Sequence, residues 1–491
     1  MRLLNECIYE EGSMVAKVSN KQGASPKSFQ NKLERHDRKT QIVADLIVIV
    51  ICLAVLFLLD SVLDSSSMIF VVLKKTAVYA VVAVSMNLLN GFTGLFSLGQ
   101  AGFMLIGAYT YGILMIPSGD RASVYQYFDG GIVKFSLQEV FAGIFGGNAG
   151  VGMFFGVLIA LILAGVFAAL FAFLIGLPVL RLKGDYLAIA TLGFAEIIRA
   201  LFQWNTIGGL TNGSNMLRKF PSFDSIVAGW AAGSPFVAAH IPFFSTLLPM
   251  IIAAICISLI VMLIHSSYGR SFKAIRDDEV AAETMGINLA KHKMLAFCTS
   301  SFFAGIGGAM LAMFQTTIQA NAFKSSMTYE ILLIVVIGGI GSVTGSILGA
   351  FLFVAASEWW LRFLDTEMVF ADAGTKTGFV IFAVAIVALL AALVIVKNRG
   401  KEKKDFRRIA IIAAAVAFIV IAALINYLVS PSMNVPLLRS GFRLVVFSLI
   451  IMIIVLFYRR GIMGTRELNW DSVTAFFMKR RNADKEGGEK A

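Results

Sequence analysis

Long apolar runs separated by short polar connections make up most of this chain. A helix needs about 20 apolar residues to cross a bilayer, and about twelve runs approach that length. They are 42–59, 68–89, 98–116, 151–177, 186–204, 241–264, 294–314, 329–343, 346–363, 378–396, 409–429 and 442–458. We therefore predict an all-α integral membrane protein, a polytopic bundle of about twelve transmembrane helices. The third, eighth and ninth runs are rich in glycine or short, and could instead be re-entrant.

Composition supports the same class. The 491 residues are 58% hydrophobic and 15% charged, with a mean hydropathy of +0.81. Soluble domains carry about 25% charged residues, so one continuous membrane bundle is favoured over several soluble domains. The four cysteines suggest no disulfide framework, and no His/Cys spacing suggests a metal site.

The net charge of +12 follows the connections between the runs. If residues 1–41 are cytoplasmic, the connections on that side hold 30 of the 42 Lys and Arg residues, and the opposite connections hold 7. Cytoplasmic loops of membrane proteins carry such an excess. We therefore predict a multi-pass protein of the bacterial cytoplasmic (inner) membrane with both termini cytoplasmic. The charge reflects this topology, and binding of nucleic acid is not expected.

One connection, 265–293, is long, polar and of mixed charge. It contains a predicted short helix that starts at Val280 and is ended by Gly286, a residue suited to a helix C-cap. Asp277, Asp278 and Glu279 precede this helix, where negative charge is favourable. The residues alone leave two readings open, a solvated connector or a docking site for a soluble partner.

The stretch YGRSFKAIRDDEVAAETMGIN in this connection resembles the coupling loop of ABC importer permeases of the branched-chain amino acid permease family. Ala281, Ala282 and Gly286 match that loop's EAA-xxx-G spacing, and Val280 replaces its usual Glu. Similar blocks are NLLNGFTGLFSLGQAGFMLIGAY, LRLKGDYLAIATLGFAEIIR, SFFAGIGGAMLAMF, VIGGIGSVTGSILGAFL and RLVVFSLIIMIIVLFYRRGIMG. The second block is similar to the M-type permease subunit.

The resemblance implies a domain plan built on a core of about ten spans. The parts are a basic tail (1–41), the first part of the permease core (42–363), an inserted helix pair (364–440), a closing helix (441–464) and a C-terminal tail (465–491). It also implies a permease subunit for Leu, Ile and Val that binds no cofactor and is not an enzyme, because ATP and Mg are used by partner subunits.

The implied partners are two ABC ATPase subunits, a second permease subunit, an extracytoplasmic substrate-binding protein and membrane lipid. The ATPase-coupling residues would be Arg276, Val280, Ala281, Ala282, Glu283 and Gly286. Cargo such as urea or short amides remains an alternative, as does a stand-alone secondary transporter with twelve helices.

A path for an amino acid needs a few polar groups among apolar walls. The candidates are Thr191, Glu196, Thr211, Asn212 and Glu330, together with the half-helix termini near Gly94. Glu196 could instead pair with Arg199, three residues further on. Gly341, Gly345 and Gly349 recur every four residues and would share one helix face. Static helix packing and a moving interface both fit that pattern.

Overall fold

The computed structural model describes residues 50, 53–62, 67–182, 184–231, 235–360, 461–464 and 467. Predictions for 1–41, for the inserted pair 364–440 and for the last three apolar runs lie outside the described residues. The chain divides into two units, Met1–Ala355 with Ile454–Ala491, and Ala356–Ile453. Only the π-helix Ala356–Trp360 of the second unit is described, so the following concerns the first unit.

Helices make up nearly all of the described part. The long ones are α3 (Met68–Asn87, continued by the π-helix Leu88–Phe92), α4 (Gln100–Met115), α7 (Ala149–Val179), α8 (Asp185–Gln203), α12 (Ile241–His265) and α15 (Leu289–Gln315). Within the described residues, five helices are long and apolar enough to span a membrane. Counting α4 with the bent segment after it gives six. The all-helical membrane class is thus confirmed, while the count of twelve stays a prediction.

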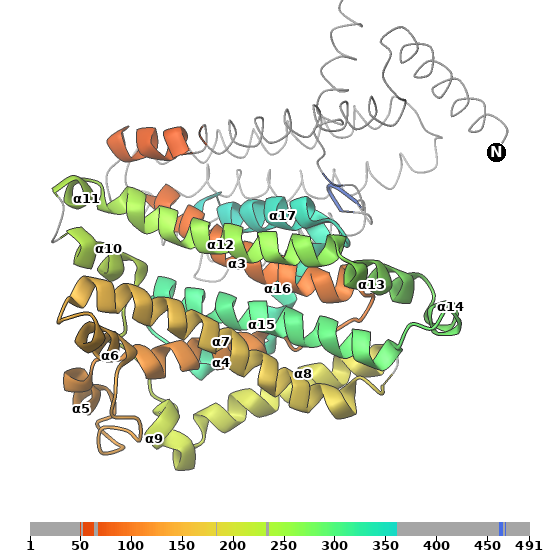
Figure 1. Cartoon of the computed structure of the whole chain (residues 1–491), viewed down its shortest axis with the longest axis horizontal. Coiled ribbons are helices and arrows are strands. Elements are labelled where there is room, and N and C mark those ends of the chain that lie inside the picture. Colours follow the sequence, from red (N-terminus) through yellow and green to blue (C-terminus); the bar gives the residue numbers. More distant parts are fainter. Residues whose placement is uncertain are drawn as a thin grey trace, which may run out of the picture. The chain divides into compact units, whose positions relative to one another are not determined.

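Short elements gather at the two ends of these helices (Figure 1). At one end, called here the α9 end, lie α5 (Arg121–Val124), α6 (Leu137–Ile144), α9 (Gly208–Thr211), α10 (Phe223–Ala231) and α11 (Pro235–Ala239). At the opposite end, called the α14 end, lie α13 (Ser267–Asp277) and α14 (Glu279–Thr284). The two groups therefore mark opposite ends of the bundle.

The central helix is α15. Inside the molecule, 72% of its most apolar window is buried, compared with 28% for α12. It packs against α3, α4 and α7, and the contacts with α4 are backbone to backbone. A Cβ atom on Gly308 would lie 2.0 Å from the carbonyl oxygen of Met104. Small residues allow this close approach, which supplies packing energy that the hydrophobic effect cannot supply between helices in lipid.

We expect Gly107→Ala to destabilise the fold strongly. The added Cβ would lie 2.0 Å from the carbonyl oxygen of Gly305 on α15, and backbone cannot move aside as a side chain can. Overpacking of this kind costs about 1–3 kcal/mol or more. The matched control is Gly193→Ala in α8, where the Cβ meets nothing within 4 Å. Thermal unfolding in detergent should show a lower Tm for the first variant only, and equal Tm values would contradict this packing.

The pair α16 (Ser325–Gly338) and α17 (Val343–Ala355) is short and tightly packed. A Cβ on Gly345 would lie 2.4 Å from the Gly338 carbonyl oxygen, and one on Gly349 would lie 2.6 Å from that of Ile334. The expectation that Gly341 shares their helix face is wrong. Gly341 precedes α17 and lies in the turn between the helices with a φ of 89°, a conformation that glycine adopts without steric cost.

Candidate functional site

The polar connection folds into two short helices at the α14 end. In α13 one side is buried, with Phe272 0% and Ile275 1% exposed, so this helix is fixed against the bundle. The Asp278 side chain then accepts hydrogen bonds from the backbone N–H groups of Val280 (2.8 Å) and Ala281 (3.0 Å). This N-cap satisfies donors that a helix start leaves free. The predicted start of α14 is thus confirmed within one or two residues.

Gly286 ends α14 in a Schellman motif. The Ile287 N–H bonds to the Ala282 carbonyl at 3.1 Å, and the Gly286 N–H bonds to the Glu283 carbonyl at 2.9 Å. Gly286 has a φ of 85°, the left-handed conformation that this motif requires. The predicted C-cap is therefore confirmed, and α14 is closed at both ends although it is only six residues long.

We expect Gly286→Ala to loosen α14 without a steric clash. A Cβ at this position meets nothing within 4 Å, so only the backbone conformation is penalised. That penalty is roughly 1–2 kcal/mol. Hydrogen exchange of α14 should accelerate about 5- to 30-fold, as that free energy implies, while exchange in α15 stays unchanged. Gly143→Ala in α6, where a Cβ also meets nothing but no positive φ is required, is the control. Unchanged exchange in α14 would contradict this role for Gly286.

The outer surface of α14 is partly apolar. Val280 is 71% and Met285 82% exposed, whereas Ala282 is 4% exposed. Ala281 and Glu283 are also exposed. The small side chain at position 282 therefore faces the molecule, and the side chains available to a partner include those of Val280, Ala281, Glu283 and Met285. We refer to these four as the α14 surface.

Arg276 connects α13 to the end of α3. Its Nη1 donates to the Gly91 carbonyl at 3.2 Å, and its Nε and Nη2 donate to Oδ1 of Asp277. Gly94, a predicted path residue, lies directly against it, since a Cβ there would be 2.9 Å from the Arg276 Cγ. Gly94 has a φ of 75°. The structure thus brings together Arg276 and Gly94, which the sequence assigned to different roles.

Asn87, which sequence reasoning missed, joins this end of α3 to the α16–α17 turn. It is fully buried. Its Oδ1 accepts from the Gly341 N–H at 2.8 Å, and its Nδ2 donates to the Ser342 carbonyl (2.9 Å) and to Oγ of Ser346 (2.8 Å). The π-helix Leu88–Phe92 follows at once, and such local widenings are frequent at functional sites. A polar side chain inside an apolar run was the available signal.

The segment after the closing run also reaches this turn. The N–H groups of Ile462 and Met463 bond to the carbonyls of Ile337 and Gly338. The Glu467 carboxylate accepts from the N–H groups of Val343 (2.6 Å) and Thr344 (3.1 Å) at the start of α17. A carboxylate is favourable there because of the free N–H groups and the helix dipole.

The polar residues predicted on α8 are occupied by contacts within the chain. Thr191 is 2% exposed and accepts from the Leu98 N–H at 3.0 Å. Glu196 pairs with Nε of Arg199 at 2.6 Å and accepts from the backbone N–H of Ser325 at 3.2 Å and from its hydroxyl. Its side chain is nevertheless 37% exposed. Glu330 lies nearby on α16 and is half-buried.

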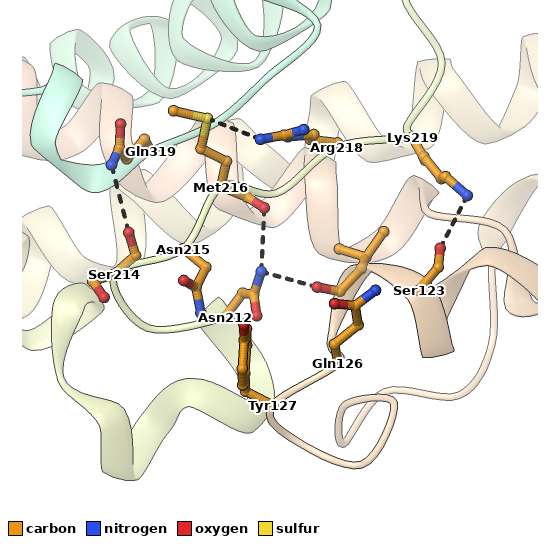
Figure 2. A pocket seen from close by; sticks show the side chains of 11 residues that line it. Ser123, Gln126, Tyr127, Asn212, Ser214, Asn215, Met216, Arg218, Lys219 and Gln319 are labelled. Atoms are coloured by element: carbon orange, nitrogen blue, oxygen red, sulfur yellow. Dashed lines mark hydrogen bonds between the residues drawn. The ribbon is translucent and has the colours of Figure 1, made fainter.

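A cavity of about 620 Å³ opens at the α9 end. Asn212 lines it, and Figure 2 shows the amide of this residue pointing to the Met216 carbonyl, a hydrogen bond of 3.2 Å. Asn212 and its neighbour Thr211 are each 1% exposed, so both mainly hold the loop together. Arg218 and Lys219 are the charged residues in the lining.

Comparison with known proteins places these features in a family. The family model described as branched-chain amino acid transport system, permease component, matches residues 68–389. The high-affinity branched-chain amino acid transport system permease proteins LivM of Salmonella typhimurium and Escherichia coli are each 31% identical over 308 residues. These alignments cover 60% of this chain and 64% of each relative, so the chain spans less than two thirds of their length.

A probable branched-chain amino acid transport permease protein LivM of Methanocaldococcus jannaschii is 27% identical over 302 residues, covering 59% of this chain and 80% of the relative. No solved structure matches the chain. The family match extends over more than half of the chain and includes α3 to α17. The predicted resemblance is therefore confirmed, and the chain belongs to the family of permease components of branched-chain amino acid transport systems.

Proposed function

We propose that this chain is a permease subunit of an ATP-driven importer of branched-chain amino acids, coupled to its ATPase subunits through α14. The observation that supports this most is the capped α14, which exposes Val280 and Met285 at one end of the bundle. Exposed apolar side chains on a fixed element in a polar connection suit the docking of a protein partner. The relatives' names supply the substrate class.

In this proposal the α14 end faces the cytoplasm and both termini lie on that side of the inner membrane. The chain has about twelve spans, of which the pair in 364–440 is an addition to the family core. Two ATPase subunits, a second permease subunit and an extracytoplasmic binding protein complete the transporter. The chain itself binds no nucleotide, and ATP with Mg is used by the ATPase subunits.

Motion at α14 has a continuous route into the bundle. Arg276 at the end of α13 contacts the Gly91 carbonyl, and Asn87, one helical turn before Gly91, holds the α16–α17 turn. Packed, hydrogen-bonded elements of this kind can carry coupling between distant sites. Directly after this turn, the N–H group of Val343 donates a hydrogen bond to the Glu467 carboxylate.

Reconstitution in sealed vesicles tests this function. The chain with its ATPases, second permease and binding protein should concentrate leucine only when ATP is supplied, and unlabelled isoleucine or valine should compete. Uptake by the chain alone, driven by a proton or sodium gradient, would instead identify a stand-alone secondary transporter. Competition by urea or acetamide and not by leucine would identify a permease for short amides.

A further inference from the structure

One helix assigned to the membrane carries a half-buried ion pair. Glu196 and Arg199 lie in the apolar span Tyr186–Gln203, and their side chains are 37% and 21% exposed. Glu196 precedes Gln203 by seven residues, which is about 10 Å at the rise of an α-helix. Charged groups at this depth are costly against lipid and usually face a protein interior or a water-filled cavity.

The exposed faces of α7 and α12 differ in this respect. Ala149–Val179 contains no charged residue, and its exposed side chains include Leu158, Ile162 and Leu170. On α12 the exposed side chains include Ile255 and Leu259. Such faces suit hydrocarbon. The helix α8 also exposes apolar side chains, Ile189, Ile197 and Leu201, and it differs from α7 and α12 in the charged pair that it carries among them.

The start of α16 extends the polar region next to Glu196. Ser325, the first residue of α16, donates its N–H and hydroxyl to the Glu196 carboxylate, so α16 begins level with that residue. Lys324 and Ser326 on either side are exposed. With 14 residues, α16 is about 21 Å long, short of the roughly 30 Å hydrocarbon core. Non-helical backbone at such depth is tolerated only inside protein or beside water.

We propose that the half-buried Glu196 and the exposed residues Gly193, Lys324 and Ser326, together called the α8–α16 surface, border a water-containing path that the second permease subunit closes from the other side. This inference rests on the proposed function for the identity of the partner. The ion pair and the start of α16 would face water along the route of a zwitterionic substrate, while the faces of α7 and α12 contact lipid.

Thiol labelling of the assembled transporter in native membranes tests the α8–α16 surface. Gly193→Cys and the control Ala254→Cys on α12 both lie near the middle of an apolar helix and are exposed. Both are placed in a background whose native cysteines, Cys7, Cys52, Cys256 and Cys298, are replaced by alanine. We expect the water-soluble reagent methanethiosulfonate ethylsulfonate to modify Gly193→Cys at least about tenfold faster than Ala254→Cys, because the reactive thiolate forms in water.

Two results would overturn the inference. In the first, both cysteines react equally slowly with the charged reagent and both react with a lipid-soluble maleimide. That result would mean that lipid covers this face of α8. Protection of Gly193→Cys from both reagents would mean that dry protein covers it. The proposed function is judged separately, by ATP-driven uptake in the cysteine-free background. If that uptake is absent while Gly193→Cys still reacts quickly, the wet surface stands and the importer assignment fails.

Discussion

The double variant Val280→Asp, Met285→Asp should lose ATP-driven uptake while the chain remains folded in the membrane. Both side chains project from the α14 surface and are 71% and 82% exposed, so aspartate is tolerated in the isolated chain. In the complex their burial would contribute about 1.5–3 kcal/mol each. The double variant loses this burial energy and also buries two unpaired carboxylates. ATPase binding should therefore weaken by more than about 100-fold, since each 1.4 kcal/mol changes a dissociation constant tenfold.

Co-purification of the ATPase subunits measures this effect directly, together with uptake in vesicles. The control is Ile132→Asp, which changes a side chain of matched exposure, 72%, at the α9 end, where the Ile132 N–H bonds to the Gly209 carbonyl of α9. It should retain the ATPase subunits. If the double variant keeps them with unchanged affinity, α14 is a solvated connector and docking occurs elsewhere.

The second large effect is expected for Asn87→Leu, a change to an apolar side chain of similar size. It removes the hydrogen bonds that Asn87 makes to Gly341, Ser342 and Ser346, and it leaves the buried Gly341 N–H without an acceptor. The Ser342 carbonyl still accepts from the N–H and the hydroxyl of Ser346. An unsatisfied buried group costs about 1–3 kcal/mol, so the turn separates from the end of α3. We expect ATP hydrolysis to continue while leucine uptake falls at least about tenfold, the equivalent of 1.4 kcal/mol.

The number of ATP molecules hydrolysed per leucine imported is the decisive measurement, because general unfolding would lower both rates together. Ser346→Ala removes only one of the three hydrogen bonds and should give an intermediate ratio. Asn90→Ala is the control, since the hydrogen bonds of the Asn90 amide join it to the backbone of Ser97 and not to the α16–α17 turn. A normal ratio in the Asn87 variant, at normal membrane levels, would exclude Asn87 from the coupling route.

The parts of the site that depend on neighbouring residues were predictable from the sequence. The acidic residues before Val280 and the glycine at 286 specify the two ends of α14 locally, because a cap needs only residues within one turn. The long apolar helices were equally readable, since hydropathy alone marks them. Their bounds in the structure differ from the predicted runs by only a few residues at each end.

Features that depend on distant residues were not predictable. Asn87 and Ser342 are 255 positions apart, and Glu467 and Val343 are 124 apart, so no local pattern announces either contact. The same limit explains the error at Gly341, where regular spacing suggested a helix that in fact starts later. It also explains the inward direction of Ala282, which is set by where α13 holds α14 against the bundle.

The position of Glu467 bears on how the gene can be edited. Its carboxylate is the acceptor for the first N–H groups of α17, although it follows the closing hydrophobic run. A stop codon or an affinity tag placed just ahead of this codon would remove that acceptor and disturb a helix more than a hundred positions upstream. Fusions for purification or fluorescence should therefore begin downstream of Glu467. The fusion protein then keeps the same hydrogen bonds at the first turn of α17 as the native protein.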